Sequence, residues 1–272
     1  LSAFNTILNF LKILKILKNN NKKIFNVIES YKPNLIIIDS VYVSRKIKNF
    51  SIPIIALNNS DYTKELYYQN KKIPFNVKSQ FHLIELGDYF YHKYIPDLVI
   101  SPTFETTEPK KITKNLIRVG PIFRKDLLKK NKLISQPINV LCMLSGSENS
   151  TKINFKKNNK NLNINVVGNI QNLINKSFNK SINYVGKIIN NIDYLNNADY
   201  CVVNAGFSAL SEIFYLNIPS VIIPITNHAE QWTNANQLAK KKIALLANND
   251  NYEEKINEII DKDEKFRNNF KN

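Results

Sequence analysis

One stretch, Asp199–Ala244, restricts most strongly what this chain of 272 residues can fold into. The apolar run Tyr200–Val203 predicts a short buried strand, which stops at a turn that ends in Gly206. Apolar residues then recur at helical spacing over residues 208–216, and Pro219 ends that helix. A strand that feeds a helix through a glycine turn is the repeating unit of a parallel α/β fold.

The same stretch repeats this pattern. Ser220–Ile225 predicts a second buried strand, and a polar loop from Thr226 to Gln231 follows it. Another helix is expected to begin near Asn234. Both turns lie where strands end, and open α/β sheets bind ligands at the carboxyl ends of their strands. The sequence therefore predicts a ligand site built from these two turns.

The first turn suits a phosphate group. A glycine turn that opens a helix leaves backbone N–H groups pointing outward, and the helix dipole favours an anion there. Glu212 lies one turn into the predicted helix over residues 208–216, where its carboxylate can accept hydrogen bonds from neutral hydroxyls. Glu230 and Gln231 offer a similar polar surface at the second turn. A phosphate site beside several groups that bind hydroxyls indicates a nucleotide sugar.

The stretch resembles the donor-binding half of GT-B glycosyltransferases, and most closely the MurG-like enzymes of family 28. Those enzymes carry a Gly turn, a Ser or Thr, a Glu one turn on, a Gly-x-Pro strand, and a loop that ends in Gln and Asn-Ala. The matching residues here are Gly206, Ser208, Glu212, Ile218-Pro219, Gln231 and Asn234-Ala235. Asn217 stands where the family usually has Gly.

The resemblance implies an α/β architecture in which two Rossmann-like, doubly wound domains face each other across a cleft. Val119-Gly120-Pro121 resembles the linker between such domains. Residues 1–120 then form a partial acceptor-side domain, and residues 121–272 form the donor-binding domain. A complete first domain begins with a strand and a Gly-rich loop, whereas this chain enters at a helix. We therefore expect the first domain to be incomplete, with about three strands before the linker.

The resemblance also implies a reaction. A hexosyl unit, or an N-acetylhexosaminyl unit, moves from a UDP-linked sugar to an acceptor hydroxyl on a lipid-linked or glycan acceptor, as in the synthesis of cell envelope polysaccharide. Glu212 is expected to bind the ribose hydroxyls, Gln231 and Glu230 the sugar hydroxyls, and the loop at Ile188 the base. The expected donor-binding residues are Ser145, Gly146, Ser147, Ile188, Gly206, Phe207, Ser208, Glu212, Glu230, Gln231 and Asn234.

No catalytic base is assigned. His228, in the loop at the donor cleft, is read either as a weak catalytic candidate or as a turn residue. His82 and His92 lie in an aromatic-rich helical stretch and are interpreted as surface or core residues. An Asp-x-Asp pattern occurs only in the helical tail, at 261–263. We therefore predict no metal and no cofactor, with the leaving diphosphate stabilised by the helix dipole and backbone N–H groups.

The acceptor side has weaker candidates. Polar residues follow the predicted strands Asn34–Asp39, Ser51–Leu57 and Asp97–Ser101. They are either acceptor-site residues or ordinary turn residues, since Asp, Asn and Ser are common in turns. These candidates are Asp39, Ser40, Asn58, Asn59 and Ser101.

The charge and the cysteines bear on partners and location. A formal net charge of +16 favours anionic partners, but the basic residues are spread without a recognition motif, so no nucleic-acid partner is predicted. A helix expected over Phe4–Lys18 either rests its lysines on a membrane or packs on the sheet. Cys142 and Cys201 lie in apolar runs and are interpreted as core residues, which favours the cytoplasm or the inner face of its membrane.

Three other functions stay open. The first is a nucleotide-sugar hydrolase or 2-epimerase of the same fold. The second is a non-catalytic donor-binding subunit that needs a partner chain. The third, suggested by charge alone, is a nucleic-acid-binding protein. Release of free sugar, an epimerised donor, turnover only with a partner, or salt-sensitive nucleic-acid binding would separate these functions from a transferase.

Overall fold

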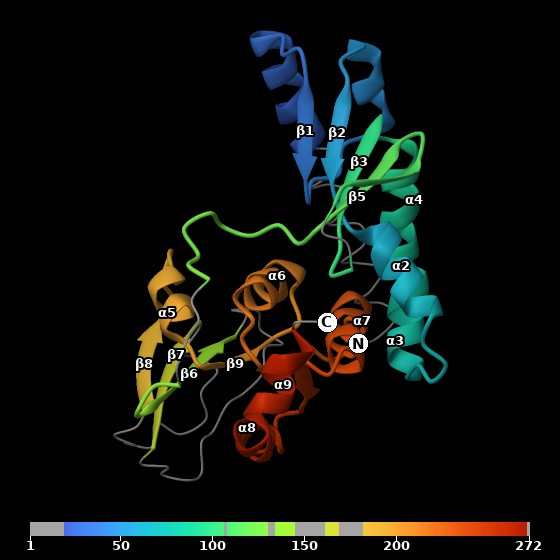
Figure 1. Cartoon of the computed structure of the whole chain (residues 1–272). Helices are drawn as coiled ribbons and strands as arrows, with labels where there is room; N and C mark the ends of the chain where they lie inside the picture. The colour runs from blue at the N-terminus through green and yellow to red at the C-terminus, as the bar shows by residue number, and fades with distance from the viewer. Residues whose placement is uncertain (1–18, 106–107, 130–133, 145–160, 169–181, 271–272) are drawn as a thin grey trace. The chain divides into compact units, whose positions relative to one another are not determined.

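The computed structural model describes residues 19–105, 108–129, 134–144, 161–168 and 182–270. The chain divides into two compact units, each built on its own sheet (Figure 1). The first unit comprises Leu1–Asp61 and Gly87–Val119, and the second comprises Tyr62–Leu86 and Gly120–Asn272. The segment Tyr62–Leu86 therefore belongs to the second unit, whereas the division made from sequence placed it in the first.

The first unit contains a five-stranded sheet in the order β1-β2-β3-β5-β4. Neighbouring strands are parallel except for the antiparallel pair β4–β5 at the edge. Ile38, Ile54 and Val99 of this sheet pack into one core with η1 (Arg45–Phe50). The strands are β1 (Ile36–Asp39), β2 (Ile54–Leu57), β3 (Leu98–Pro102), β4 (Lys110–Thr113) and β5 (Leu116–Val119).

The expectation of about three strands before the linker was wrong, because β4 and β5 add two more. All residues of β4 are exposed and those of β5 are only half-buried, so neither strand carries the buried apolar run that marks a strand in a sequence. The lysines of β4 also suit an exposed edge strand, since charge discourages pairing with another chain.

The second unit contains a six-stranded sheet in the order β11-β10-β9-β6-β7-β8. The pairs between its strands are parallel. The chain runs outward from β6 to β8, returns to β9, and continues the other way to β11, which is a doubly wound topology. This confirms the predicted fold class. The strands are β6 (Ile138–Met143), β7 (Leu162–Val167), β8 (Ile182–Gly186), β9 (Tyr200–Val203), β10 (Ser220–Ile222) and β11 (Ala244–Leu246).

The core of the second unit lies between this sheet and α8. Val140, Val202 and Val221 of the sheet pack against Ile256 and Ile259 of α8. Cys142 and Cys201 are free and fully buried in the same sheet, as expected of core residues. The remaining helices are α2 (Ser60–Tyr68), α3 (Phe75–Gln80), η2 (Phe81–Glu85), α4 (Leu86–Tyr94), α5 (Ile192–Asn197), α6 (Phe207–Leu216), α7 (Ala229–Lys240), α8 (Tyr252–Asp261) and α9 (Asp263–Asn269).

Helix α7 begins at Ala229, not near Asn234 as the sequence suggested. Glu230 and Gln231 consequently lie in the first helical turn and not in a loop. The predicted helix over Phe4–Lys18 and the turn Ser145-Gly146-Ser147 fall outside the described residues. In the part of the chain that the structure describes, no helix is both long enough and apolar enough to span a membrane.

The end of α6 provides a test of the fold. Asn217 caps this helix with φ 56° and ψ 43°, a left-handed conformation that costs most residues about 1–2 kcal/mol. Glycine adopts it freely and asparagine tolerates it, which explains why Asn occupies the position of the family's Gly. We expect Asn217→Ala to lower the free energy of unfolding by about 1 kcal/mol and Asn217→Gly to preserve it. Urea unfolding followed by circular dichroism measures both, and equal stability of the two variants would contradict the prediction.

Candidate functional site

The turn between β9 and α6 has open space in front of it. Gly206 is the N-cap of α6, with φ −66° and ψ 133°, so its backbone does not itself require glycine. A Cβ added at Gly206 would meet nothing within 4 Å. Ser208, in the first turn of α6, is exposed. The amino-terminal end of the helix is thus open to a ligand, and its dipole favours an anion there.

Two side chains of helix α7 hold this turn in place through hydrogen bonds. The side-chain oxygen of Gln231 accepts hydrogen bonds from the N–H groups of Ala205 (3.2 Å) and Ile225 (3.0 Å). Asn234 Nδ2 donates to the carbonyl of Ala205 at 3.2 Å. Both side chains are buried. Gln231 and Asn234, one turn apart on α7, therefore bond the N–H and the carbonyl of Ala205, the residue that precedes Gly206.

These contacts restrict what the two amides can do for a ligand. Two backbone N–H groups already use Gln231 Oε1, so its Nε2 is the atom left to bind a sugar hydroxyl. Asn234 is fully buried, and its Oδ1 has no partner among the described residues. Their roles in donor binding stay predictions, as does that of Glu230, which is half-buried beside them.

Glu212 is buried and ion-paired. Arg124 Nε donates to its Oε1 at 2.6 Å, and Arg124 Nη2 donates to its Oε2 at 2.8 Å. This two-bond geometry is the strong form of an arginine–carboxylate pair, and the Glu212 carboxylate raises the pKa of the Arg124 guanidinium. Glu212 is 8% exposed, which is not the environment of a solvated surface residue.

Arg124 is the functional candidate that the sequence did not reveal. Its Nη2 also donates to Asn191 Oδ1 at 2.6 Å, and its Nη1 donates to Asn190 Oδ1 at 3.3 Å. Both asparagines follow the loop at Ile188, which is half-buried. Arg124 therefore joins the loop predicted to hold the base to the carboxylate predicted to hold the ribose. Its only sequence signal is its place just after the Val-Gly-Pro linker.

The linker that carries Arg124 is itself fixed to the second unit. Phe123 stacks on Tyr215 of α6, with ring centroids 3.7 Å apart and an interplanar angle of 18°. A little further on, the N–H of Leu128 donates to Asn196 Oδ1 of α5 at 2.9 Å. The backbone on both sides of Arg124 is thus anchored, which restricts where its guanidinium can lie.

A segment from the first half of the chain caps α7. Gln80 Oε1 accepts the N–H of Ala229 at 2.8 Å, and Gln80 Nε2 donates to Glu85 Oε1 at 2.8 Å. Phe81 packs in one buried cluster with Ala229 and Trp232. The N-cap residue of α7, His228, makes no side-chain cap bond of its own. Gln80 therefore supplies an acceptor at the start of the helix that holds the Gly206 turn.

His228 is half-buried at this position. Burial lowers the pKa of its imidazole, although the nearby Glu85 carboxylate opposes the shift. Its Nδ1 is buried without a partner in the described part of the chain. The neutral imidazole is consequently favoured near neutral pH. Its catalytic role stays a prediction.

The other sequence candidates lie in different surroundings. His82 is exposed, whereas His92 is buried with its Nδ1 3.0 Å from Asp88 Oδ1, so the two are a surface and a core histidine. Asn58 donates to Asp88 and accepts from the N–H of Ser60, which is the contact pattern of a turn residue. The acceptor candidates Asp39, Ser40, Asn59 and Ser101 lie at or just beyond the ends of β1, β2 and β3. The structure brings no group of three or more possible metal ligands together among the residues it describes.

The chain is similar to proteins of one enzyme family. The family model described as Glycosyl transferase family 1 matches residues 1–262. No curated protein matches the chain. SsfS6, a glycosyltransferase of Streptomyces sp. SF2575, is 16% identical with a TM-score of 0.54, over 92% of this chain and 66% of SsfS6. The chain thus spans just under two thirds of SsfS6. A second structure of SsfS6, complexed with thymidine diphosphate, matches this chain with a TM-score of 0.50.

Two further structures are similar. The glycotransferase of kitacinnamycin is 15% identical with a TM-score of 0.61, over 97% of this chain and 77% of that protein. The spinosyn rhamnosyltransferase SpnG, complexed with spinosyn aglycone, is 10% identical with a TM-score of 0.57, over 95% of this chain and 73% of SpnG. At these identities the likeness shows the GT-B fold. The family match is to family 1, and the closer likeness to MurG-like enzymes stays a prediction.

The ion pair between Arg124 and Glu212 gives one prediction. Arg124→Ala leaves a buried carboxylate without its donor, so we expect the free energy of unfolding to fall by about 1–3 kcal/mol. Arg124→Lys should restore only part of the loss, because lysine cannot form the two-bond contact. Urea unfolding measures both effects. Lys262→Ala, which breaks an exposed pair with Glu258, is the control and should change stability by less than about 1 kcal/mol. Equal effects of Arg124→Ala and the control would contradict the ion pair.

The cap on α7 gives a second prediction. Gln80→Ala removes the acceptor of the Ala229 N–H, so we expect faster hydrogen exchange in the first turn of α7 and a loss of about 1 kcal/mol of stability. Gln69→Ala is the matched control, since the exposed side chain of Gln69, just after α2, bonds to Glu65 and not to α7. Hydrogen exchange followed by mass spectrometry measures the α7 peptide. Unchanged exchange in Gln80→Ala would show that the side chain does not hold the helix.

Proposed function

Because the chain belongs to glycosyl transferase family 1, we propose that it transfers a hexosyl unit from a nucleotide diphosphate sugar to an acceptor hydroxyl. The proposal includes a UDP-linked donor, a lipid-linked or glycan acceptor of the kind MurG-like enzymes use, and no metal ion. One observation carries it. The open start of α6 at Gly206 precedes, in the same helix, a buried carboxylate, Glu212, that an arginine holds in a fixed orientation.

The start of α6 suits the leaving group of this reaction. The acceptor hydroxyl attacks the anomeric carbon while the bond from that carbon to the diphosphate oxygen breaks, and a base removes the hydroxyl proton. Negative charge then grows on the diphosphate. The first backbone N–H groups of α6 and the dipole of the helix stabilise that charge without a metal.

Glu212 suits the ribose. Each carboxylate oxygen accepts one bond from Arg124 and has further lone-pair capacity. A ribose hydroxyl can therefore donate to Glu212 while the ion pair persists. In this scheme Arg124 orients the carboxylate, and the neighbouring loop at Ile188 holds the base. Gln231 Nε2 and the Glu230 carboxylate bind hydroxyls of the sugar.

Two of the similar structures support the substrate classes. SsfS6 has been solved with thymidine diphosphate, which is a pyrimidine nucleoside diphosphate as UDP is. SpnG has been solved with spinosyn aglycone. Both agree with a nucleotide-sugar donor and a separate acceptor for this chain.

Gly206→Ala tests the donor site without disturbing the fold. The backbone angles at Gly206 are open to alanine, and the added methyl would occupy only the space in front of α6. We expect unchanged stability and UDP binding weaker by about 1–3 kcal/mol. Gly87→Ala is the matched control, because a Cβ there also meets nothing within 4 Å. Calorimetric titration with UDP measures both, and equal affinity of the two variants would remove the phosphate assignment.

Turnover separates the transferase from its alternatives. The purified chain is incubated with UDP-, TDP- and GDP-sugars, with and without candidate acceptor glycans, and products are followed by mass spectrometry in the presence of EDTA. Acceptor-dependent glycoside formation is the expected result. Free sugar without an acceptor indicates a hydrolase, epimerised donor an epimerase, and tight donor binding without turnover a donor-binding subunit. Loss of activity in EDTA would overturn metal independence.

A further inference from the structure

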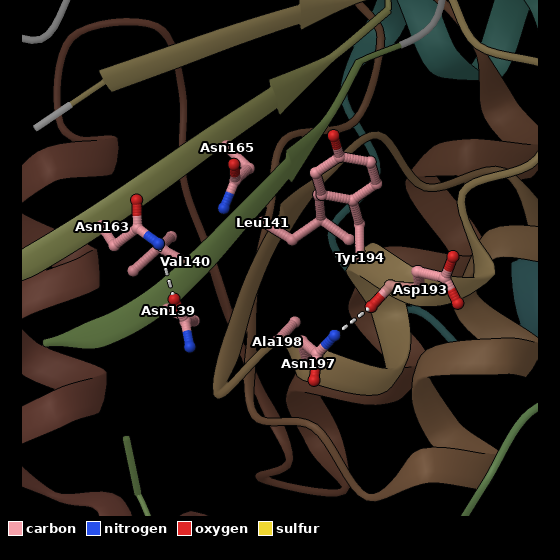
Figure 2. Close-up of a pocket in the computed structure, with 9 residues that line it drawn as sticks. All are labelled: Asn139, Val140, Leu141, Asn163, Asn165, Asp193, Tyr194, Asn197 and Ala198. Carbon is pink, nitrogen blue, oxygen red and sulfur yellow. Dashed lines mark hydrogen bonds between the residues drawn. The ribbon is translucent and has the colours of Figure 1, made fainter. Parts of the chain in front are cut away.

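The second unit has a hollow that the donor site does not use. It measures about 320 Å³ and lies between the face of β6 and β7 and helix α5 (Figure 2). Asn139 and Asn163 are the second residues of β6 and β7, near the amino ends of these parallel strands. The Gly206 turn follows the opposite, carboxyl end of the sheet. The lining residues are Asn139, Val140, Leu141, Asn163, Asn165, Asp193, Tyr194, Asn197 and Ala198.

The sheet side of the hollow is lined with amides. Asn139 and Asn163 lie opposite each other in the register of β6 and β7, and Asn163 Nδ2 donates to Asn139 Oδ1 at 2.8 Å. Asn165 lies two residues further along the same face of β7 and accepts a bond from Asn183 at 2.9 Å. After these bonds, Asn139 Nδ2, Asn163 Oδ1 and Asn165 Nδ2 have no partner among the described residues. All three amides are half-buried, so their unpaired atoms border the hollow and can reach a ligand in it.

Helix α5 supplies the other side. Asp193 and Tyr194 lie on it, and Figure 2 shows both beside the hollow with Asn197. The Asn197 amide donates to the Asp193 carbonyl at 2.8 Å, which leaves its Oδ1 without a partner in the described chain. The Tyr194 hydroxyl and the Asp193 carboxylate are likewise without described partners. Between the two polar sides lie the apolar residues Leu141 and Ala198, both buried.

We propose that this hollow is a second binding site, for a neutral saccharide. A sugar ring presents hydroxyls that both donate and accept, together with apolar C–H faces, and amides beside an apolar floor match that combination. The Asp193 carboxylate disfavours an anionic ligand, and no described basic side chain lines the hollow. A volume of about 320 Å³ is at the small end of ligand sites. The site is separate from the proposed donor site, and its assignment does not depend on that function.

Direct binding tests the proposal on the full chain. Glucose, N-acetylglucosamine and maltotriose are titrated at millimolar concentration and followed by saturation-transfer NMR, in the parent and in Gly206→Ala. Binding that is equal in both is expected, because the hollow shares no residue with the Gly206 turn. Asn163→Ala and Asn165→Ala should weaken it about tenfold, the equivalent of one lost hydrogen bond of about 1.4 kcal/mol. Asn236→Ala, whose amide bonds only within α7, is the matched control and should bind as the parent does.

Several outcomes would overturn the proposal. These are absence of binding by all three sugars, binding that Asn163→Ala and Asn165→Ala leave unchanged, and preferential binding of a nucleoside such as uridine at the same residues. Asp193→Asn, on the exposed surface of α5, serves as a further variant if the strand variants do not fold, and it should weaken sugar binding severalfold. Loss of binding in Gly206→Ala would assign the sugar to the donor site and likewise reject the hollow.

Discussion

The hydrogen bonds between α7 and the backbone of Ala205 are the interactions on which the candidate site depends. Gln231 joins the ends of two neighbouring strands, because one buried oxygen accepts N–H groups from the chain after β9 and the chain after β10. The Asn234 amide donates to the carbonyl of Ala205, so both backbone groups of that residue are bonded to α7. Buried polar groups are costly to leave unpaired, so these bonds fix the turn in one geometry. The direction in which α6 presents its amino-terminal end therefore follows from α7.

Helix α7 is in turn held by a segment that is distant in the sequence. Gln80 caps the N–H of Ala229, and Phe81 packs against the same residue. The unit that contains the Gly206 turn is thus built from two separate pieces of chain, Tyr62–Leu86 and Gly120–Asn272. Cutting the chain at the linker would keep every motif recognised in the sequence and still remove the cap that positions their helix.

Local sequence patterns predicted what local physics determines. The buried strand Tyr200–Val203 and the end of α6 before Pro219 were both found where the patterns put them. The patterns missed β4 and β5 because these strands have no buried apolar run, although they are close in sequence and pair with each other. The start of α7 depends on Gln80, and the role of Arg124 depends on where the linker packs. The partners of α7 and Arg124 are distant in sequence, so no short segment of sequence contains that information.

Arg124 also resolves an electrostatic difficulty in the site. A carboxylate within α6, less than two turns from its start, would repel a diphosphate bound there, and burial strengthens that repulsion because the local dielectric is low. The bidentate pair makes Glu212 and Arg124 together neutral. The carboxylate keeps lone pairs for neutral hydroxyls but contributes no net charge against the anion. In the proposed donor site, a phosphate close to a buried glutamate therefore needs a cation beside the glutamate, and Arg124 of the linker supplies it.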